Sequence, residues 1–174
     1  MVKGSDNKLC TNLYKKEIKR RRWQSVLLQE LYNNNMISFA EKCDDWKEAI
    51  FESIEPLVQQ KIIDSKYGQE IIESVEKYGP YIVISEDVCI PHASVSEAVH
   101  SSGIAMLVVQ TPVNFENEED FRPRIFFPFC ALDSDVHLAN LAEISDLCSD
   151  EKQLQKILSF QRKEDVEKYL NEAK

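Results

Sequence analysis

Hydrophobic residues recur along this chain with two different spacings, which predict helices in one part and strands in another. Between residues 45 and 78 the apolar side chains return every three or four positions, the spacing of one buried face of an α-helix. Beyond residue 80 they gather in short continuous runs, typical of strands that are buried on both faces of a sheet. Strands with helices between them and on both sides indicate the α/β class.

The first expected helix spans Leu13–Tyr32 and begins with a basic cluster between Lys15 and Arg22. Such a cluster could serve as a nucleic-acid arm or as a tether to a partner. We favour a solvated helix face, because an amphipathic pattern follows at once and the chain as a whole is acidic.

Two more helices are expected before residue 80. The second begins at Asp45, which resembles the start of a capping box with Glu48 three residues later. Pro56 falls inside its apolar stripe and is expected to kink the helix or to end its first part. The third helix begins near Tyr67 and is expected to stop at Gly79-Pro80, an ordinary helix-termination signal.

The segment Gly79–Ala93 has the sequence GPYIVISEDVCIPHA. It predicts a short strand at Tyr81–Ile84, a polar turn, and a second apolar piece at Val88–Ile90. Pro91 then stiffens the backbone directly before His92. This arrangement would hold one imidazole at the rim of a sheet, although an isolated histidine is more often a residue without chemistry.

Two further strands and an acidic loop are expected in the middle of the chain. Gly103–Gln110 is a continuous apolar run, and Arg124–Leu132 is another that contains Pro128. A proline lacks the N–H that a central strand needs, so we expect an edge strand or a bulge at that point. The acidic residues 116–120 are consecutive, which favours a solvated loop over a calcium site.

The C-terminal part is expected to be helical. Ser134 or Asp135 would cap a helix that has His137 in its first turn, with one side formed by Leu138, Leu141, Ala142 and Cys148. Asp150 caps the next helix, and a last helix covers about 163–171.

Composition narrows the class of protein. A chain of 174 residues is expected to form one domain, and its net charge of −9 argues against nucleic acid and anionic membranes as partners. No apolar run reaches the length of a membrane span, and no secretory signal is visible, so we expect a cytoplasmic protein. The cysteines are read as reduced thiols, and three are expected in the core: Cys89, Cys130 and Cys148.

Several motifs together resemble a known family. GPYIVI, then IPHA, then the apolar strand ending at Pro112-Val113, then HLANLAEI are similar to enzyme IIA (EIIA) domains of the bacterial sugar phosphotransferase system (PTS). The resemblance is to the mannitol/fructose superfamily, and within it most to the ascorbate-type branch. It implies a mixed five-stranded sheet flanked by helices on both sides. Residues 1–22 would be an N-terminal extension with the start of the first helix, and residues 23–174 the EIIA domain.

The resemblance also implies roles for two histidines. His92 would accept a phosphoryl group from phospho-HPr on its ε nitrogen and pass it to a cysteine of enzyme IIB, and so indirectly serve the membrane component enzyme IIC in uptake of a sugar such as ascorbate or a pentitol. His137 would stabilise the phosphoryl group from the start of its helix, where anions are favoured. No cofactor or metal is implied, and the oligomeric state stays open, a homodimer included.

One departure from the family and several rival interpretations remain. Mannitol-type relatives place an arginine where this chain has Ser74-Val75-Glu76, so the phosphoryl group would depend on backbone N–H groups, or transfer would be impaired. A zinc site of Cys89, His92 and His100 lacks a fourth ligand. The alternative functions are an EIIA-like regulatory domain of a transcriptional regulator and a binding module that no longer transfers phosphate. If the chain is complete, the absence of a helix-turn-helix favours a free-standing transport component; if Met1 was introduced by cloning, the regulatory domain gains weight.

Overall fold

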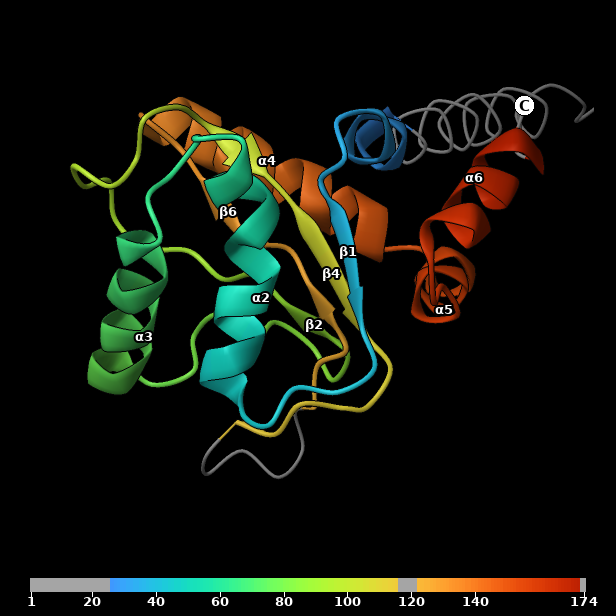
Figure 1. The fold of residues 1–174 in the computed structure, drawn as a ribbon, viewed down its shortest axis with the longest axis horizontal. Helices are drawn as coiled ribbons and strands as arrows, with labels where there is room; N and C mark the ends of the chain where they lie inside the picture. The colour runs from blue at the N-terminus through green and yellow to red at the C-terminus, as the bar shows by residue number, and fades with distance from the viewer. Residues whose placement is uncertain (1–25, 116–121, 173–174) are drawn as a thin grey trace, which may run out of the picture.

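The computed structural model describes residues 26–115 and 122–172, and Figure 1 shows a sheet with helices on both of its sides. Four strands form the main sheet in the order β1-β4-β5-β2, and two more form a small sheet, β3-β6. The pairs β1–β4 and β2–β5 are parallel, whereas β4–β5 and β3–β6 are antiparallel. The strands are β1 Ile37–Ala40, β2 Val88–Cys89, β3 Gly103–Ile104, β4 Met106–Val109, β5 Ile125–Phe126 and β6 Phe129–Cys130. The mixed α/β class is therefore confirmed, with four plus two strands in place of five.

The helices follow the order that the sequence predicts. Residues 26–33 are helical, and the remaining helices are α2 Trp46–Gln59, α3 Lys66–Tyr78, α4 Ser134–Cys148, α5 Glu151–Leu158 and α6 Lys163–Glu172. In Figure 1, α2 and α3 lie on one side of the sheet and α4 crosses behind it. Several predictions concern residues outside the described parts: the basic cluster, the first half of the first helix, and the acidic residues 116–120.

Helix ends agree well with the capping signals. The Asp45 carboxylate accepts hydrogen bonds from the N–H groups of Lys47 and Glu48, so it caps α2 as predicted. Gly79 ends α3 with a φ of 84°, which a residue without Cβ adopts easily. Pro56 does not end α2, since the helix continues to Gln59.

Pro128 interrupts one sheet ladder without shifting its register. Ile104 pairs with Phe129 and Leu107 pairs with Phe126, so three steps forward on one strand match three steps back on the other. The Pro128 carbonyl still accepts a hydrogen bond from the N–H of Ala105 at 2.9 Å. No residue is inserted, so the expected bulge is absent here, while β6, which follows Pro128, pairs with β3 alone in a two-stranded sheet.

Residues 81–84 do not form the predicted strand. They form turns and a single bridge, in which Val83 pairs with Cys89. Ile82 is buried, whereas Tyr81 and Ile84 are exposed. The apolar run therefore corresponds to a compact turn. One buried side chain, Ile82, and one bridge to β2 hold this turn in place.

The buried face of α4 differs from the predicted one. Ile144 and Leu147 are buried, and Leu141 packs against the core. Leu138 is 64% exposed, and Ala142 is also exposed. The core-facing stripe is therefore rotated away from Leu138 by about one position, and an apolar side chain is left at the surface.

The core encloses most of the described cysteines. Cys43, Cys89 and Cys130 are buried, Cys148 is half-buried, and all four are free thiols. Burial raises the pKa of Cys148 to about 12 and that of Cys130 to about 11, so these side chains stay protonated at neutral pH. No helix within residues 26–115 or 122–172 is long and apolar enough to cross a bilayer.

Candidate functional site

His92 lies three residues beyond the end of β2, on backbone that is hydrogen-bonded to the neighbouring strand. The N–H of Phe127 donates to the Cys89 carbonyl at 2.8 Å, and the N–H of Phe129 donates to the Pro91 carbonyl at 3.1 Å. The parallel ladder therefore continues through Pro91, which cannot donate a hydrogen bond itself. As a result, the residue before His92 is fixed on β6.

The His92 ring is held in one tautomer. Its Nδ1 lies 2.7 Å from the carbonyl oxygen of Ile90, and a carbonyl can only accept, so Nδ1 carries the proton. The uncharged ring then has its free lone pair on Nε2. This is the arrangement that a nucleophilic imidazole requires.

The structure brings His137 beside His92, although 45 residues separate them in the chain. The two ring centroids are 5.4 Å apart. Phe129 lies against both rings, stacked on His92 at 4.8 Å and tilted against His137 at 5.2 Å. One buried phenyl ring thus forms a common floor for both imidazoles.

Two tyrosines hold the backbone around His92. The Tyr81 hydroxyl donates to the His92 carbonyl at 2.9 Å, and its ring meets the imidazole edge-on at 5.5 Å. The Tyr67 hydroxyl lies 3.0 Å from both the N and O atoms of Ala93 and 3.3 Å from the carbonyl oxygen of Phe129. Both residues come from the segment that leads into the site, so the site depends on α3 and on the turn after it.

A pocket with a cavity volume of about 550 Å³ opens over the two histidines. Among the described residues that line it there is no lysine or arginine, and Asp133 brings a negative charge. Hydroxyl groups line the walls instead, from Ser74, Ser94, Ser134, Tyr78 and Tyr81. Polar donors without formal charge are therefore the groups available to an anion here, together with His137.

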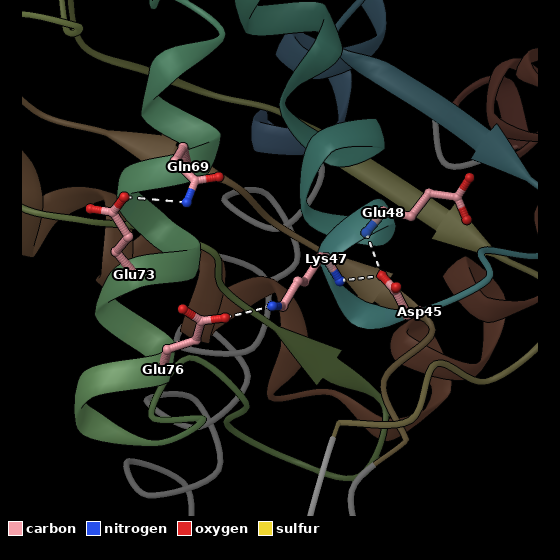
Figure 2. A network of polar contacts seen from close by, with 6 residues as sticks. All are labelled: Asp45, Lys47, Glu48, Gln69, Glu73 and Glu76. Carbon is pink, nitrogen blue, oxygen red and sulfur yellow. Dashed lines mark hydrogen bonds and ion pairs between the residues drawn. The ribbon is translucent and has the colours of Figure 1, made fainter.

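Two residues of α3, Ser74 and Glu76, lie in the stretch where mannitol-type relatives have an arginine. Ser74 lines the pocket, whereas Glu76 forms an ion pair with Lys47 of α2, as Figure 2 shows. In this stretch, Ser74 therefore contributes a hydroxyl to the pocket wall, and the Glu76 carboxylate pairs with α2 instead of facing the pocket lining.

The start of α4 lies at this site, because Asp133, Ser134 and His137 line the pocket. Asp133, and not Ser134 or Asp135 as predicted, is the N-cap, with its carboxylate accepting from the N–H of Val136 at 2.9 Å. The N–H of His137 bonds to the Asp133 carbonyl. No hydrogen bond joins the N–H groups of Ser134 or Asp135 to another described residue, so the helix start retains donors for an anion.

Burial shapes the acid–base behaviour of the site. It lowers the pKa of His92 below that of a free histidine. The hydrogen bond to Ile90 opposes this shift, and a charge on His137 adds to it. The net direction keeps His92 uncharged, and therefore nucleophilic, at neutral pH.

His100 does not belong to this site. It is exposed, as predicted, and its Nε2 lies 3.0 Å from the Asp64 carboxylate in a different pocket. Within the described part of the chain, no group of three or more histidine, cysteine and acidic residues is arranged to hold a metal. Cys89 is a fully buried residue of β2, and His100 lines a different pocket from His92, so the three residues are not brought together.

Exposed apolar side chains gather around the pocket. Tyr78, Tyr81 and Val95 line it, and Leu132 and Leu138 each follow a lining residue in the chain; all five are at least 42% exposed. We call these five residues the apolar rim. Apolar groups concentrated around one polar pocket are typical of a protein-docking surface.

Sequence reasoning identified both histidines and missed their surroundings. From the sequence, Tyr67 only marks the start of an expected helix and Phe129 only falls within an expected strand. Tyr81 stands in the GPYIVI motif, but the strand predicted there gave it no role. Hydrogen bonds from a side chain to distant backbone leave no periodic signal in a sequence.

Comparisons with known proteins agree with the motifs. The family model described as phosphoenolpyruvate-dependent sugar phosphotransferase system, EIIA 2, matches residues 30–173. The ascorbate-specific PTS system EIIA component of Salmonella typhimurium is 26% identical over 141 residues, which cover 80% of this chain and 92% of that protein. The Escherichia coli component with the same description is 25% identical over the same lengths.

Solved structures give the same picture. A crystal structure assigned as a PTS IIA domain from Streptococcus pyogenes has a TM-score of 0.72 and 27% identity, covering 84% of this chain and 94% of that one. The Escherichia coli complex of enzyme IIA for mannitol with phosphorylated enzyme IIB has a TM-score of 0.67 over 79% of this chain and 94% of that one; at 19% identity it shows likeness of fold alone.

Proposed function

Because this chain belongs to the EIIA 2 family of the phosphoenolpyruvate-dependent sugar phosphotransferase system, and is thus a phosphotransferase component of a phosphoryl relay, we propose that His92 is its phosphoryl acceptor. The donor is phospho-HPr, and the recipient is a cysteine of a cognate enzyme IIB. The two relatives described above are ascorbate-specific components, which supports ascorbate as the transported substrate.

The observation that carries the proposal is the hydrogen bond from His92 Nδ1 to the Ile90 carbonyl at 2.7 Å. It directs the lone pair of Nε2 to the pocket side of the ring. Nε2 attacks the phosphorus of the phosphohistidine donor, a new P–N bond forms, and the P–N bond of the donor breaks. In the second step a thiolate of enzyme IIB attacks the same phosphorus, and the His92 ring leaves with its Nδ1 proton in place.

Stabilisation of the transferring group comes from His137 and from backbone N–H groups. In phosphoryl transfer the protein mainly positions the reactants and stabilises charge on the phosphoryl oxygens. His137 lies beside His92, and the N–H groups of Ser134 and Asp135 begin α4 at the same pocket. These donors take the place of the arginine of mannitol-type relatives.

Docking of the partner is assigned to the apolar rim. A phosphoryl relay requires direct contact between proteins, so enzyme IIB must cover the pocket during transfer. The complex of a related fold with phosphorylated enzyme IIB supports this kind of partner. Burial of exposed leucine, valine and tyrosine side chains would supply much of the binding free energy.

The test is phosphorylation in vitro. The chain is incubated with enzyme I, HPr and phosphoenolpyruvate, and the intact mass is measured. We expect one phosphoryl adduct, which is absent in His92→Ala. In His137→Ala the adduct should form roughly 100-fold more slowly, in line with loss of one preorganised donor.

His100→Ala is the matched control, because it removes an exposed histidine from a different pocket. It should be phosphorylated at the rate of the unmodified chain. An adduct that persists in His92→Ala, or no adduct on the unmodified chain, would overturn the assignment.

A further inference from the structure

Tyr67 has a hydroxyl group in a place where hydrophobic packing alone would need only a phenyl ring. The residue is 1% exposed and lies in the first turn of α3. A hydroxyl in such a position is unfavourable unless it is hydrogen-bonded. Its hydrogen bonds therefore indicate why a tyrosine is present.

All of these hydrogen bonds go to backbone that surrounds His92. The hydroxyl oxygen accepts from the N–H of Ala93 at 3.0 Å. Its single proton is shared between the carbonyl oxygens of Ala93 and Phe129, at 3.0 and 3.3 Å. One side chain thus joins the residue that follows His92 to the strand that lies beneath it.

This link lies where the sheet ladder ends. Hydrogen bonds between strands hold the chain through Pro91, whose carbonyl accepts from Phe129. Beyond that point, residues 91–96 have no regular secondary structure. Ala93 is the first residue after the histidine, and its N–H donates to Tyr67. The Tyr67 hydroxyl therefore joins Ala93 to Phe129 where direct backbone hydrogen bonds between the strands have ended.

Phe129 is the second half of the link. Its ring stacks on His92 at 4.8 Å with an interplanar angle of 21°, and it also lies against His137. Tying the Phe129 carbonyl to the Ala93 backbone therefore fixes the floor of the site relative to the chain that carries the ring. A change at Tyr67 would alter the tilt of His92 and its distance from the Ile90 carbonyl together.

We infer that Tyr67 is a positioning residue for His92, whose hydroxyl joins the His92–Ala93 backbone to β6 and thereby holds the imidazole as the Nδ1–H tautomer facing the pocket. Its importance for transfer rests on the proposed role of His92, but its effect on the ring does not. The hydroxyl itself touches no reacting atom.

The experiment compares Tyr67→Phe with Ile71→Val. Both changes affect the buried side of α3, but Ile71→Val removes only a methylene and no hydrogen bond to the site. Long-range ¹H–¹⁵N spectra of the ring nitrogens report the tautomer of His92 in the folded protein. We expect a dominant Nδ1–H form in the unmodified chain and in Ile71→Val, and a mixture of tautomers in Tyr67→Phe.

The rate of phosphorylation by phospho-HPr is measured on the same samples. Tyr67→Phe should be roughly 10- to 100-fold slower, as expected for a misplaced reacting group, while Ile71→Val keeps the unmodified rate. If Tyr67→Phe leaves both the ¹⁵N shifts and the rate equal to those of Ile71→Val, or if both variants lose activity equally, the inference is wrong.

These readouts separate the two proposals. If His92 is not the acceptor, the unmodified chain fails the phosphorylation test, while the tautomer comparison still decides whether Tyr67 orients the ring. If only the positioning role fails, phosphorylation on His92 persists and the tautomer is unchanged in Tyr67→Phe.

Discussion

The environment of His92 fixes both its geometry and its charge. Burial lowers its pKa, the hydrogen bond to Ile90 raises it in opposition, and the charge of a protonated His137 lowers it further. The unfolded chain, with a pKa of about 6.5 for its histidines, thus binds more protons around pH 6. The contribution of uncharged His92 to the free energy of unfolding is therefore fully present above about pH 6.5. It is lost as the pH falls through the pKa that His92 has in the folded protein.

Replacement of His137 should move this titration. In His137→Ala the pKa of His92 should rise toward the ordinary histidine value, because a nearby positive charge disappears and the ring becomes less buried. Titration of the His92 ring signals by NMR measures it, with His100→Ala as the control that leaves the pKa unchanged. An unchanged or lower pKa in His137→Ala would show that the rings do not interact.

At the scale of elements, single carboxylates set where helices begin. Asp45 caps α2, and its carboxylate accepts hydrogen bonds from two backbone N–H groups, as Figure 2 shows. Its neighbour Asp44 makes an exposed ion pair with Lys42, which contributes little. The two adjacent acids therefore differ in function although they have the same side chain.

Asp45→Ala should lower the free energy of unfolding by about 1 kcal/mol, the usual effect of removing an N-cap. Asp44→Ala, with the same change of charge, should stay within about 0.5 kcal/mol of the unmodified chain. Denaturant unfolding followed by circular dichroism measures both. Equal losses in the two variants would mean that charge, and not capping, is responsible.

The same elements show what the sequence could reveal. The cap at Asp45 and the stop at Gly79 were predictable, because capping depends on neighbours within a few residues. The two histidines that the structure brings together were singled out through ordered motifs of a family. The turn at 81–84 and the exposed Leu138 were missed, because an apolar run does not say whether a sheet, a turn or a partner covers it.

Pro128 illustrates the same limit in a strand. Like any proline, Pro128 lacks a backbone N–H, so the loss of one hydrogen-bond donor could be predicted. Whether the strand bulges depends on the register of the opposite strand, where Ala105 meets the Pro128 carbonyl without displacement. Register is set by both strands together, so neither strand alone predicts it.

At the scale of the whole molecule, an acidic protein presents an apolar rim around one polar pocket. The net charge of −9 favours solubility, and the apolar rim beside His92 is the face to which we assign partner docking. Under the proposed function, approach of enzyme IIB to any other face would leave its cysteine far from a phosphoryl group on His92.

Val95→Asp should weaken transfer from the phosphorylated chain to enzyme IIB by roughly tenfold or more, mainly through a higher KM, since it places a charge in an apolar contact. Val26→Asp is the matched control, an exposed valine on the helix 26–33 that does not line the pocket. Steady-state transfer assays measure both. Equal effects of the two changes would place the docking surface elsewhere.

The hydrogen bond between His92 Nδ1 and the carbonyl two residues before it has a consequence for proton transfer during the relay. With hydrogen retained on the inner nitrogen throughout, the ring can gain and lose an electrophile on its outer nitrogen without exchanging a proton with solvent. If His92 is the acceptor, as proposed, each transfer then moves a phosphoryl group alone, and the pocket needs no general acid or base for the His92 ring.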